Sequence, residues 1–309
     1  MLAVVFPGQG SQAPGMGKAF YEAGGAGREV FDQVSSAVGF DIAALCFNSD
    51  EDTLRQTQNA QIALYTVGLA AYHSIRSMAI DLPVKATAGH SVGEYAALAC
   101  AGVIEIAEGA RLVRERGRTM AEAGRGQPGT MAAVLGLERE VVEKACAAVQ
   151  GVCVLANDNC PGQLVISGDV DAVTAAGEAL KTLGAKRVLQ LNVSGAFHSP
   201  LMDSSARTMA VELQKASFSK SAIPVYSNVT AEPADQWPYL LEEQLRSPVR
   251  WTESVQHMVR DGVDTFIECG HGAVLTGLLK RIAPECTGLT VTDSATAQAA
   301  IDAVKEKNS

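Results

Sequence analysis

The chain has 309 residues, 47% hydrophobic and 19% charged, so it is long enough to bury a sizeable core in more than one structural unit. Its 25 basic and 34 acidic residues leave a formal net charge of −9, which opposes the broad positive field that nucleic-acid binding requires. The start carries no basic segment and no apolar run reaches the length of a membrane span, so we expect a soluble cytoplasmic protein without nucleic-acid or membrane partners.

The first segment has the features of a buried strand. Residues 2–6 form a continuous Val-rich apolar run, which the loop Pro7-Gly8-Gln9-Gly10-Ser11-Gln12 follows. A loop with two amide side chains at a strand end is either a plain turn or the edge of a site. Helical spacing then predicts helices over residues 27–45 and 60–78, the second apolar around most of its circumference.

A serine between two glycines occupies the next junction. Residues 84–88 predict a short strand and the Ala-rich residues 95–101 a helix, with Gly89-His90-Ser91-Val92-Gly93 between them. In such a strand-to-helix turn the serine hydroxyl projects, and the amides at the start of the helix face any oxyanion formed on it. Ser91 is therefore a candidate nucleophile, and an ordinary glycine-flanked turn is the alternative.

The next helix, predicted over residues 104–123, carries several arginines. One face is apolar and consists of Ile106, Ala110, Val113, Gly117 and Met120. Arg111, Arg114 and Arg118 fall on the opposite, solvated side. Arg116 lies beside the apolar stripe, where its guanidinium either reaches into a cleft or extends to water as a boundary residue.

A different pattern follows the breaker-rich residues 124–129, which predict a linker. Strands are predicted over residues 130–137, 152–157, 163–168 and 186–191, and helices over residues 138–149 and 170–183. The order β-α-β-β-α-β is that of the ferredoxin-like fold, so we expect a small inserted domain of about seventy residues.

Residues 192–202 return the chain from the insert and contain His198. This histidine lies in a loop bounded by Gly, Ser and Pro, whereas His73 and His257 lie within helical patterns. Further strands are predicted over residues 224–228 and 264–270, then a helix over 274–282 and an Ala-rich helix after residue 296. His271, in the loop after the last of these strands, is a rival base that spacing alone does not exclude.

The cysteines favour neither a metal site nor a disulfide framework. None forms a Cys-x-x-Cys pair, and their number is odd. We expect no bound metal and buried, reduced thiols that pack as small apolar side chains. The seven are Cys46, Cys100, Cys146, Cys153, Cys160, Cys269 and Cys286.

Six motifs occur in a fixed order over nearly the whole chain. They are Phe6-Pro7-Gly8-Gln9-Gly10-Ser11-Gln12, Gly89-His90-Ser91-Val92-Gly93-Glu94-Tyr95, Arg116-Gly117-Arg118-x-Met120, Asn159-Cys160-Pro161-Gly162-Gln163-x-Val165-Ile166-Ser167-Gly168, Phe197-His198-Ser199-x-Leu201-Met202 and Gln244-Leu245-x-Ser247-Pro248-Val249-x-Trp251. Together they closely resemble the malonyl-CoA:acyl-carrier-protein transacylases of fatty-acid synthesis and the related acyltransferases of polyketide synthases. Each motif alone is weak, and the ordered set is highly specific.

The resemblance implies a role for each matching residue. A serine hydroxyl needs a base and an oxyanion hole to act as a nucleophile. The resemblance makes Ser91 the acylated nucleophile and His198 its general base. It assigns the oxyanion hole to the backbone N–H groups of Gln9 and Val92, and it gives Arg116 a bidentate grip on the free malonyl carboxylate.

Three further residues receive supporting roles from the same resemblance. Gln244 looks like the residue that orients the imidazole, and His90 supports the pocket. Phe197 resembles the bulky residue that accompanies malonyl rather than methylmalonyl use in polyketide acyltransferases, and Val92 agrees with that interpretation.

The implied fold class is α/β, with an α/β-hydrolase-like large domain of residues 1–126 and 195–309. A ferredoxin-like small domain of residues 127–194 is inserted as a lid. The implied reaction is ping-pong transfer of a malonyl group from malonyl-CoA to the phosphopantetheine thiol of acyl carrier protein. The partners are thus acyl carrier protein and a coenzyme A thioester, with no cofactor, and we expect a monomer.

The sequence departs from the family pattern at two peripheral positions, where Cys160 replaces a more usual Ser or Gly and His271 a common Pro. Neither is expected to abolish the mechanism. Because the carrier protein and this chain are both acidic, docking needs a local basic patch. The candidates for it are Arg114, Arg118, Lys280 and Arg281.

Three other functions are compatible with parts of the pattern. A discrete acyltransferase of a polyketide assembly line shares all the motifs. A serine acyl hydrolase shares the serine motif, although Arg116 and the absence of an acid paired with His198 count against it. A catalytically silent interaction domain would be expected to lack Ser91 or His198, and both are present.

Overall fold

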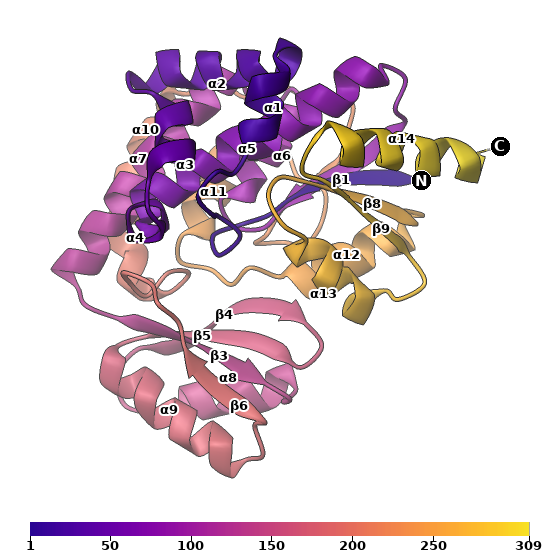
Figure 1. The fold of residues 1–309 in the computed structure, drawn as a ribbon. Helices are drawn as coiled ribbons and strands as arrows, with labels where there is room; N and C mark the ends of the chain where they lie inside the picture. The colour runs from indigo at the N-terminus through magenta and orange to yellow at the C-terminus, as the bar shows by residue number, and fades with distance from the viewer. Residues whose placement is uncertain (309) are drawn as a thin grey trace.

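The computed structural model describes residues 1–308 and contains two separate β-sheets (Figure 1). The first sheet is parallel, with the order β7-β2-β1-β8-β9. Its strands are β1 (Leu2–Phe6), β2 (Val84–Gly89), β7 (Val225–Tyr226), β8 (Thr265–Cys269) and β9 (Thr287–Val291). The Val-rich first strand is central and wholly buried, as its continuous apolar run predicts.

Helices cover both faces of this sheet. They are α1 (Lys18–Ala23), α2 (Gly25–Val38), α3 (Ile42–Asn48), α4 (Glu51–Arg55), α5 (Thr57–Met78), α6 (Gly93–Cys100), α7 (Ile106–Gly126), α10 (Asp203–Lys215), α11 (Trp237–Gln244), α12 (Trp251–Arg260), α13 (Val274–Ile282) and α14 (Ser294–Asn308), with a 3-10 turn at Pro200–Met202. Leu2, Val4 and Phe6 of β1 enter the larger core with α2, α5 and α6. Ala3 and Val5 enter a second core with α12 and α13, so the strand alternates between two packed layers.

The second sheet is antiparallel and has the order β4-β5-β3-β6. It consists of β3 (Thr130–Leu135), β4 (Cys153–Cys160), β5 (Gln163–Gly168) and β6 (Arg187–Gln190), with α8 (Arg139–Ala147) and α9 (Val170–Thr182) packed on it. The chain order β-α-β-β-α-β is the predicted one. The predicted fold class, an α/β-hydrolase-like parallel sheet with a ferredoxin-like insert, is therefore confirmed.

The two sheets are joined through β4, which lies nearest the first unit in Figure 1. The main chain of Val249 pairs with this strand: Asp158 N–H donates to the Val249 carbonyl at 2.9 Å, and Val249 N–H donates to the Ala156 carbonyl at 2.8 Å. The buried Thr252 hydroxyl, at the start of α12, also bonds to Asp158. These bonds fix the small sheet against one side of the large unit.

The single helix predicted over residues 27–45 is wrong, because the structure divides it into α2 and α3. Gly39 ends α2 in a left-handed conformation with φ 76°, and Asp41 caps α3 by accepting a hydrogen bond from Ala44 N–H at 2.9 Å. Both are ordinary helix-end signals that the apolar spacing across them concealed.

The predicted linker at residues 124–129 is also partly wrong, because α7 continues to Gly126. Gly124 is tolerated there because it packs against main chain: a Cβ on it would lie 2.3 Å from the Ser194 carbonyl oxygen. The glycine thus serves the close approach of the segment that returns from the small sheet, and it does not end the helix.

No single helix within residues 1–308 is long and apolar enough to span a membrane; α2 and α3 reach that length only as a pair bent by 112°. The seven cysteines are free thiols, and all except the partly exposed Cys286 are buried, as predicted.

Replacing Gly89 by alanine should lower the free energy of unfolding by at least ~3 kcal/mol, because a Cβ there would lie 1.9 Å from the Gly93 carbonyl group. Thermal and urea unfolding measure this. The matched control is Gly277→Ala in α13, where an added Cβ would meet no atom within 4 Å beyond its own helix backbone and chain neighbours, so the helix should become slightly more stable. Equal stability of the two variants would contradict this account of the turn.

Candidate active site

Ser91 lies in the turn between β2 and α6, with a positive φ of 51°. Its backbone N–H donates to Asn228 Oδ1 at 2.7 Å, and Asn228 Nδ2 donates to the Gly89 carbonyl at 2.7 Å. One buried asparagine side chain therefore clamps both sides of the turn. The strained serine backbone is held by these bonds and by the close packing of Gly89 on Gly93.

The imidazole of His198 lies between this serine and a main-chain carbonyl. Its Nε2 is 2.8 Å from Ser91 Oγ, and its Nδ1 is 2.8 Å from the carbonyl oxygen of Gln244. A carbonyl only accepts, so Nδ1 carries the proton and Nε2 accepts the serine hydroxyl. This is the tautomer in which a neutral histidine can take a proton from the serine.

Burial lowers the pKa of His198 to about 3, and the nearby charge of Arg116 acts in the same direction. The hydrogen bond to the Gln244 carbonyl acts in the opposite direction. The imidazole is therefore neutral at physiological pH and available as a base.

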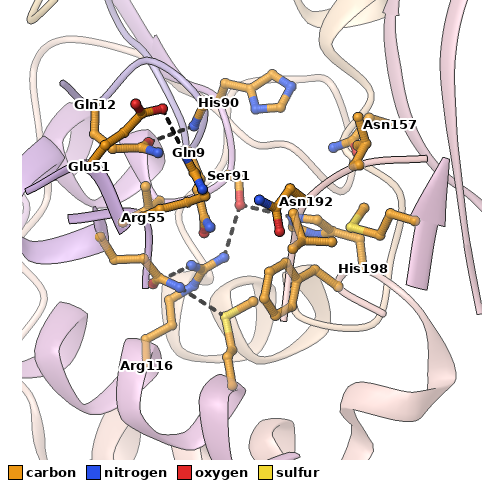
Figure 2. A pocket seen from close by; sticks show the side chains of 18 residues that line it. Gln9, Gln12, Glu51, Arg55, His90, Ser91, Arg116, Asn157, Asn192 and His198 are labelled. Carbon is orange, nitrogen blue, oxygen red and sulfur yellow. Dashed lines mark hydrogen bonds and ion pairs between the residues drawn. The ribbon is translucent and has the colours of Figure 1, made fainter. Parts of the chain in front are cut away.

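Arg116 extends from α7 to the floor of the site and is only 1% exposed, so its guanidinium is enclosed rather than turned to water. Its Nη1 donates to Gln61 Oε1 at 2.6 Å; its Nη2 donates to Gln244 Oε1 at 2.8 Å and to Ser91 Oγ at 3.1 Å. Figure 2 shows it directed at the serine. A guanidinium has five N–H donors, which leaves donors for an anion beside Ser91.

Two backbone N–H groups at the cleft around Ser91 have no hydrogen-bond acceptor among the described residues. Among residues 1–308, neither Gln9 N–H nor Val92 N–H donates a hydrogen bond, and both residues line the cleft around Ser91. They follow the carboxyl ends of β1 and β2, which are adjacent strands of the sheet. This edge of a parallel sheet is where such folds bind ligands.

A cleft of about 370 Å³ opens above these groups, between the two sheets. Arg116, Met120 and Phe197 line it together with Ser91 and His198. Met131 of β3, Asn157 of β4 and residues 191–193 line it from the small unit. The small sheet therefore forms one wall of the site (Figure 2).

The other histidines have different positions. His90 lines the cleft, and its Nε2 is 2.8 Å from Asn159 Oδ1, which ties the turn to the small sheet. His257 Nδ1 is 2.9 Å from the Ala231 carbonyl oxygen and also contacts the Glu232 carboxylate. His257 does not line the cleft. His271 and Cys160, the two departures from the family pattern, are not among the residues that line the cleft.

The polar residues of the site that were not predicted include Gln61, Glu94, Asn157 and Asn228, and Glu51, Arg55 and Asn192 also line the cleft. Glu94 directly follows the serine motif, and Asn157 begins an Asn-Asp-Asn run at the end of a predicted strand, so both carried a local signal. Gln61 and Asn228 lie in an apolar helix and after a short strand, and nothing in their neighbours marks them.

The predicted basic patch is wrong as a single surface, because α7 and α13 lie on different sides of the large unit (Figure 1). Arg118 pairs with Glu115 and Glu122 of its own helix. Arg281 instead bonds to the β4–β5 turn through Gln163 Oε1 at 3.2 Å and the Pro161 carbonyl.

Within residues 1–308, no cluster of three or more His, Cys, Asp or Glu side chains has the spacing of a metal site. The groups that contact Ser91 Oγ directly are one imidazole, that of His198, and one guanidinium, that of Arg116. Such a set suits acyl transfer through a serine ester, with a cationic subsite for an anionic substituent of the acyl group.

Comparisons with known proteins agree with this chemistry. Residues 3–300 match the family described as "Acyl transferase domain". The malonyl CoA-acyl carrier protein transacylase of Bacillus subtilis is 41% identical over 99% of this chain and 98% of its own length. The transacylase of the same name from Escherichia coli K12 is also 41% identical, over 97% and 99% of the two chains.

Solved structures show the same similarity. The Coxiella burnetii malonyl CoA-acyl carrier protein transacylase superposes with a TM-score of 0.93 at 37% identity, covering 97% of this chain and 96% of that one. A malonyl-transacylase solved in complex with its type II polyketide synthase acyl-carrier protein has a TM-score of 0.93 at 38% identity, covering 97% and 99%. On the family match and these full-length similarities, the chain belongs to the malonyl CoA-acyl carrier protein transacylase family.

Proposed function

We propose that this chain transfers a malonyl group from malonyl-CoA to the phosphopantetheine thiol of an acyl carrier protein, through a malonyl ester on Ser91, and so supplies extender units for fatty-acid synthesis. The observation that carries the proposal is the position of Ser91 Oγ, 2.8 Å from His198 Nε2 and 3.1 Å from Arg116 Nη2. A nucleophile, its base and a cation for a carboxylate thus meet at one atom.

In the first half-reaction, His198 Nε2 takes the proton from Ser91 Oγ as the oxygen attacks the thioester carbonyl. The N–H groups of Gln9 and Val92 receive the oxyanion. Collapse of the tetrahedral intermediate breaks the carbon–sulfur bond, and the imidazolium returns the proton to the departing coenzyme A sulfur. Ser91 then carries the malonyl ester.

In the second half-reaction, the carrier thiol gives its proton to His198 and attacks the ester carbonyl. The new carbon–sulfur bond forms as the bond to Ser91 Oγ breaks, and the imidazolium reprotonates the serine. The Gln244 carbonyl holds the imidazole in one tautomer throughout, because Nδ1 remains bonded to it.

Arg116 binds the free carboxylate of the malonyl group through the donors that its contacts with Gln61 and Gln244 leave available. His90 supports the cleft wall, and Phe197 limits its width to malonyl rather than methylmalonyl groups. Arg116 also disfavours a simple acyl hydrolase, because an ester hydrolase for uncharged acyl groups has no use for a buried cation.

The domain arrangement proposed with this function is a catalytic domain of residues 1–126 and 195–309, with residues 127–194 as the lid. The chain acts as a cytoplasmic monomer with no cofactor, and its partners are coenzyme A thioesters and an acyl carrier protein. A polyketide carrier is the second candidate partner, because one similar structure is a malonyl-transacylase in complex with a type II polyketide synthase carrier.

The direct test is intact-mass analysis of the protein mixed in turn with malonyl-CoA, acetyl-CoA and methylmalonyl-CoA. We expect a malonyl adduct that is absent in Ser91→Ala and that moves to holo-acyl carrier protein when this is added. Little adduct should form from the other two thioesters. An adduct that hydrolyses without transfer would support the acyl hydrolase, and equal use of methylmalonyl-CoA would refute the size argument for Phe197.

Replacing Arg116 by alanine should reduce the rate of Ser91 malonylation, as kcat/KM, about 100-fold, because a buried charge–carboxylate pair is lost. Acetylation should change much less, so that the preference for malonyl-CoA disappears. Arg118→Ala, on the exposed side of the same helix, is the control and should leave both rates unchanged. A uniform loss for both acyl groups would contradict the carboxylate role.

The pH dependence of Ser91 malonylation should reflect the lowered pKa of His198. The base is neutral imidazole, so the rate should stay constant from about pH 7 to about pH 5, whereas an ordinary histidine loses activity below about pH 6.5. Rapid-quench mass analysis measures the rate at each pH. Because unfolded His198 gains a proton that the folded residue excludes, the free energy of unfolding should fall over the same range.

A further inference from the structure

Glu94, three residues after Ser91, has a buried carboxyl group that the acyl-transfer steps do not use. It lies in the first turn of α6 and is 0% exposed. One carboxylate oxygen accepts the backbone N–H of Asn228 at 2.6 Å, and the other accepts Gln244 Nε2. Both of its partners belong to the site, because Asn228 clamps the Ser91 turn and Gln244 contacts Arg116 and His198.

The side chain of Gln244 has only one amide orientation that satisfies its neighbours. Its Oε1 accepts from Arg116 Nη2 at 2.8 Å, and its Nε2 donates to the Ser91 carbonyl at 3.0 Å as well as to Glu94. A flipped amide would direct its NH2 group at the guanidinium and its oxygen at a carbonyl and a carboxylate. Every contact would then pair donor with donor or acceptor with acceptor.

We propose that Glu94 is a positioning residue that fixes the Gln244 amide, directs Arg116 Nη2 at Ser91 Oγ through it, and thereby sets the selectivity for carboxylate-bearing acyl groups. The inference rests on the proposed function, because it concerns the subsite for the malonyl carboxylate. Glu94 does not touch the serine hydroxyl, the imidazole or the guanidinium. It acts through the 0% exposed Gln244.

The charges around Glu94 agree with this role. A buried carboxylate is costly unless hydrogen bonds or an opposite charge stabilise it. Burial raises the pKa of Glu94 to about 8, while the Asn228 and Gln244 donors and the charge of Arg116 act in the opposite direction. Both carboxylate oxygens accept N–H donors, and these hydrogen bonds favour the ionised form, whereas burial favours the protonated acid.

The test is Glu94→Gln, which keeps the size of the side chain and replaces one acceptor by a donor. That donor faces either Asn228 N–H or Gln244 Nε2, so one of the two hydrogen bonds through which Glu94 holds Asn228 and the Gln244 amide is lost. We expect the ratio of kcat/KM for malonylation to that for acetylation of Ser91 to fall at least about tenfold, mainly through a higher KM for malonyl-CoA. Glu122→Gln, at an exposed ion pair on α7, is the matched control and should keep the wild-type ratio.

A double-mutant cycle tests the route through Gln244. In a Gln244→Ala background, Glu94→Gln should change the malonyl-to-acetyl ratio little, because the amide that it orients is absent. If the double variant instead lowered the ratio by the full product of the two single effects, the route from Glu94 through Gln244 would be wrong. An unchanged ratio in folded Glu94→Gln, or an equal loss for both acyl groups, would overturn the proposal itself, since a packing defect lowers both rates together.

Thermal unfolding shows whether Glu94→Gln is folded. If it is not, Glu94→Asp serves instead, because it keeps the charge but is one methylene too short to reach both partners, and the same fall in the ratio is expected. Malonylation of the wild-type protein distinguishes a failure of this inference from a failure of the proposed function. A wild type that is not malonylated disproves the function, whereas normal wild-type malonylation with an unchanged variant ratio disproves only the role of Glu94.

Discussion

The enclosed positive charge of Arg116 is the constraint on which the arrangement of the site depends. A buried guanidinium must be hydrogen-bonded on the protein side, or its desolvation costs several kcal/mol. Its acceptors come from three distant parts of the chain: Gln61 on α5, Gln244 on α11 and Ser91 in the turn before α6. The hydrogen bonds of one charge thus connect the proposed nucleophile, the residue that holds the proposed base, and a long core helix in a single network.

The same network sustains backbone strain at Ser91 and at His198, the proposed nucleophile and base. Ser91 and His198 have positive φ angles of 51° and 57°, which residues other than glycine rarely adopt. Such strain persists only where the surroundings over-determine the conformation. Asn228 and Gln244 provide this constraint through bonds to the serine main chain and to the imidazole, and neither needs to move when a proton passes between Ser91 and His198.

Much of the fold could be predicted from local patterns, because a Val-rich run, a glycine-flanked serine and a β-α-β-β-α-β order each reflect short stretches of chain. Prediction failed where a local signal opposed a longer pattern: Gly39 and Asp41 end and begin helices within continuous apolar spacing. In the site, spacing also does not reveal which atom of Gln244 meets the imidazole. The structure uses its carbonyl for His198 and its side chain for Arg116.

The pKa of His198 connects substrate selectivity to the chemistry. The charge of Arg116 lowers this pKa, so it disfavours the imidazolium that forms when Ser91 loses its proton. In the proposed reaction, a malonyl carboxylate bound to Arg116 offsets that charge and makes the imidazolium less costly. An acetyl group brings no such anion. The buried cation would then discriminate twice, by holding the correct acyl group and by keeping the base weak until that group is in place.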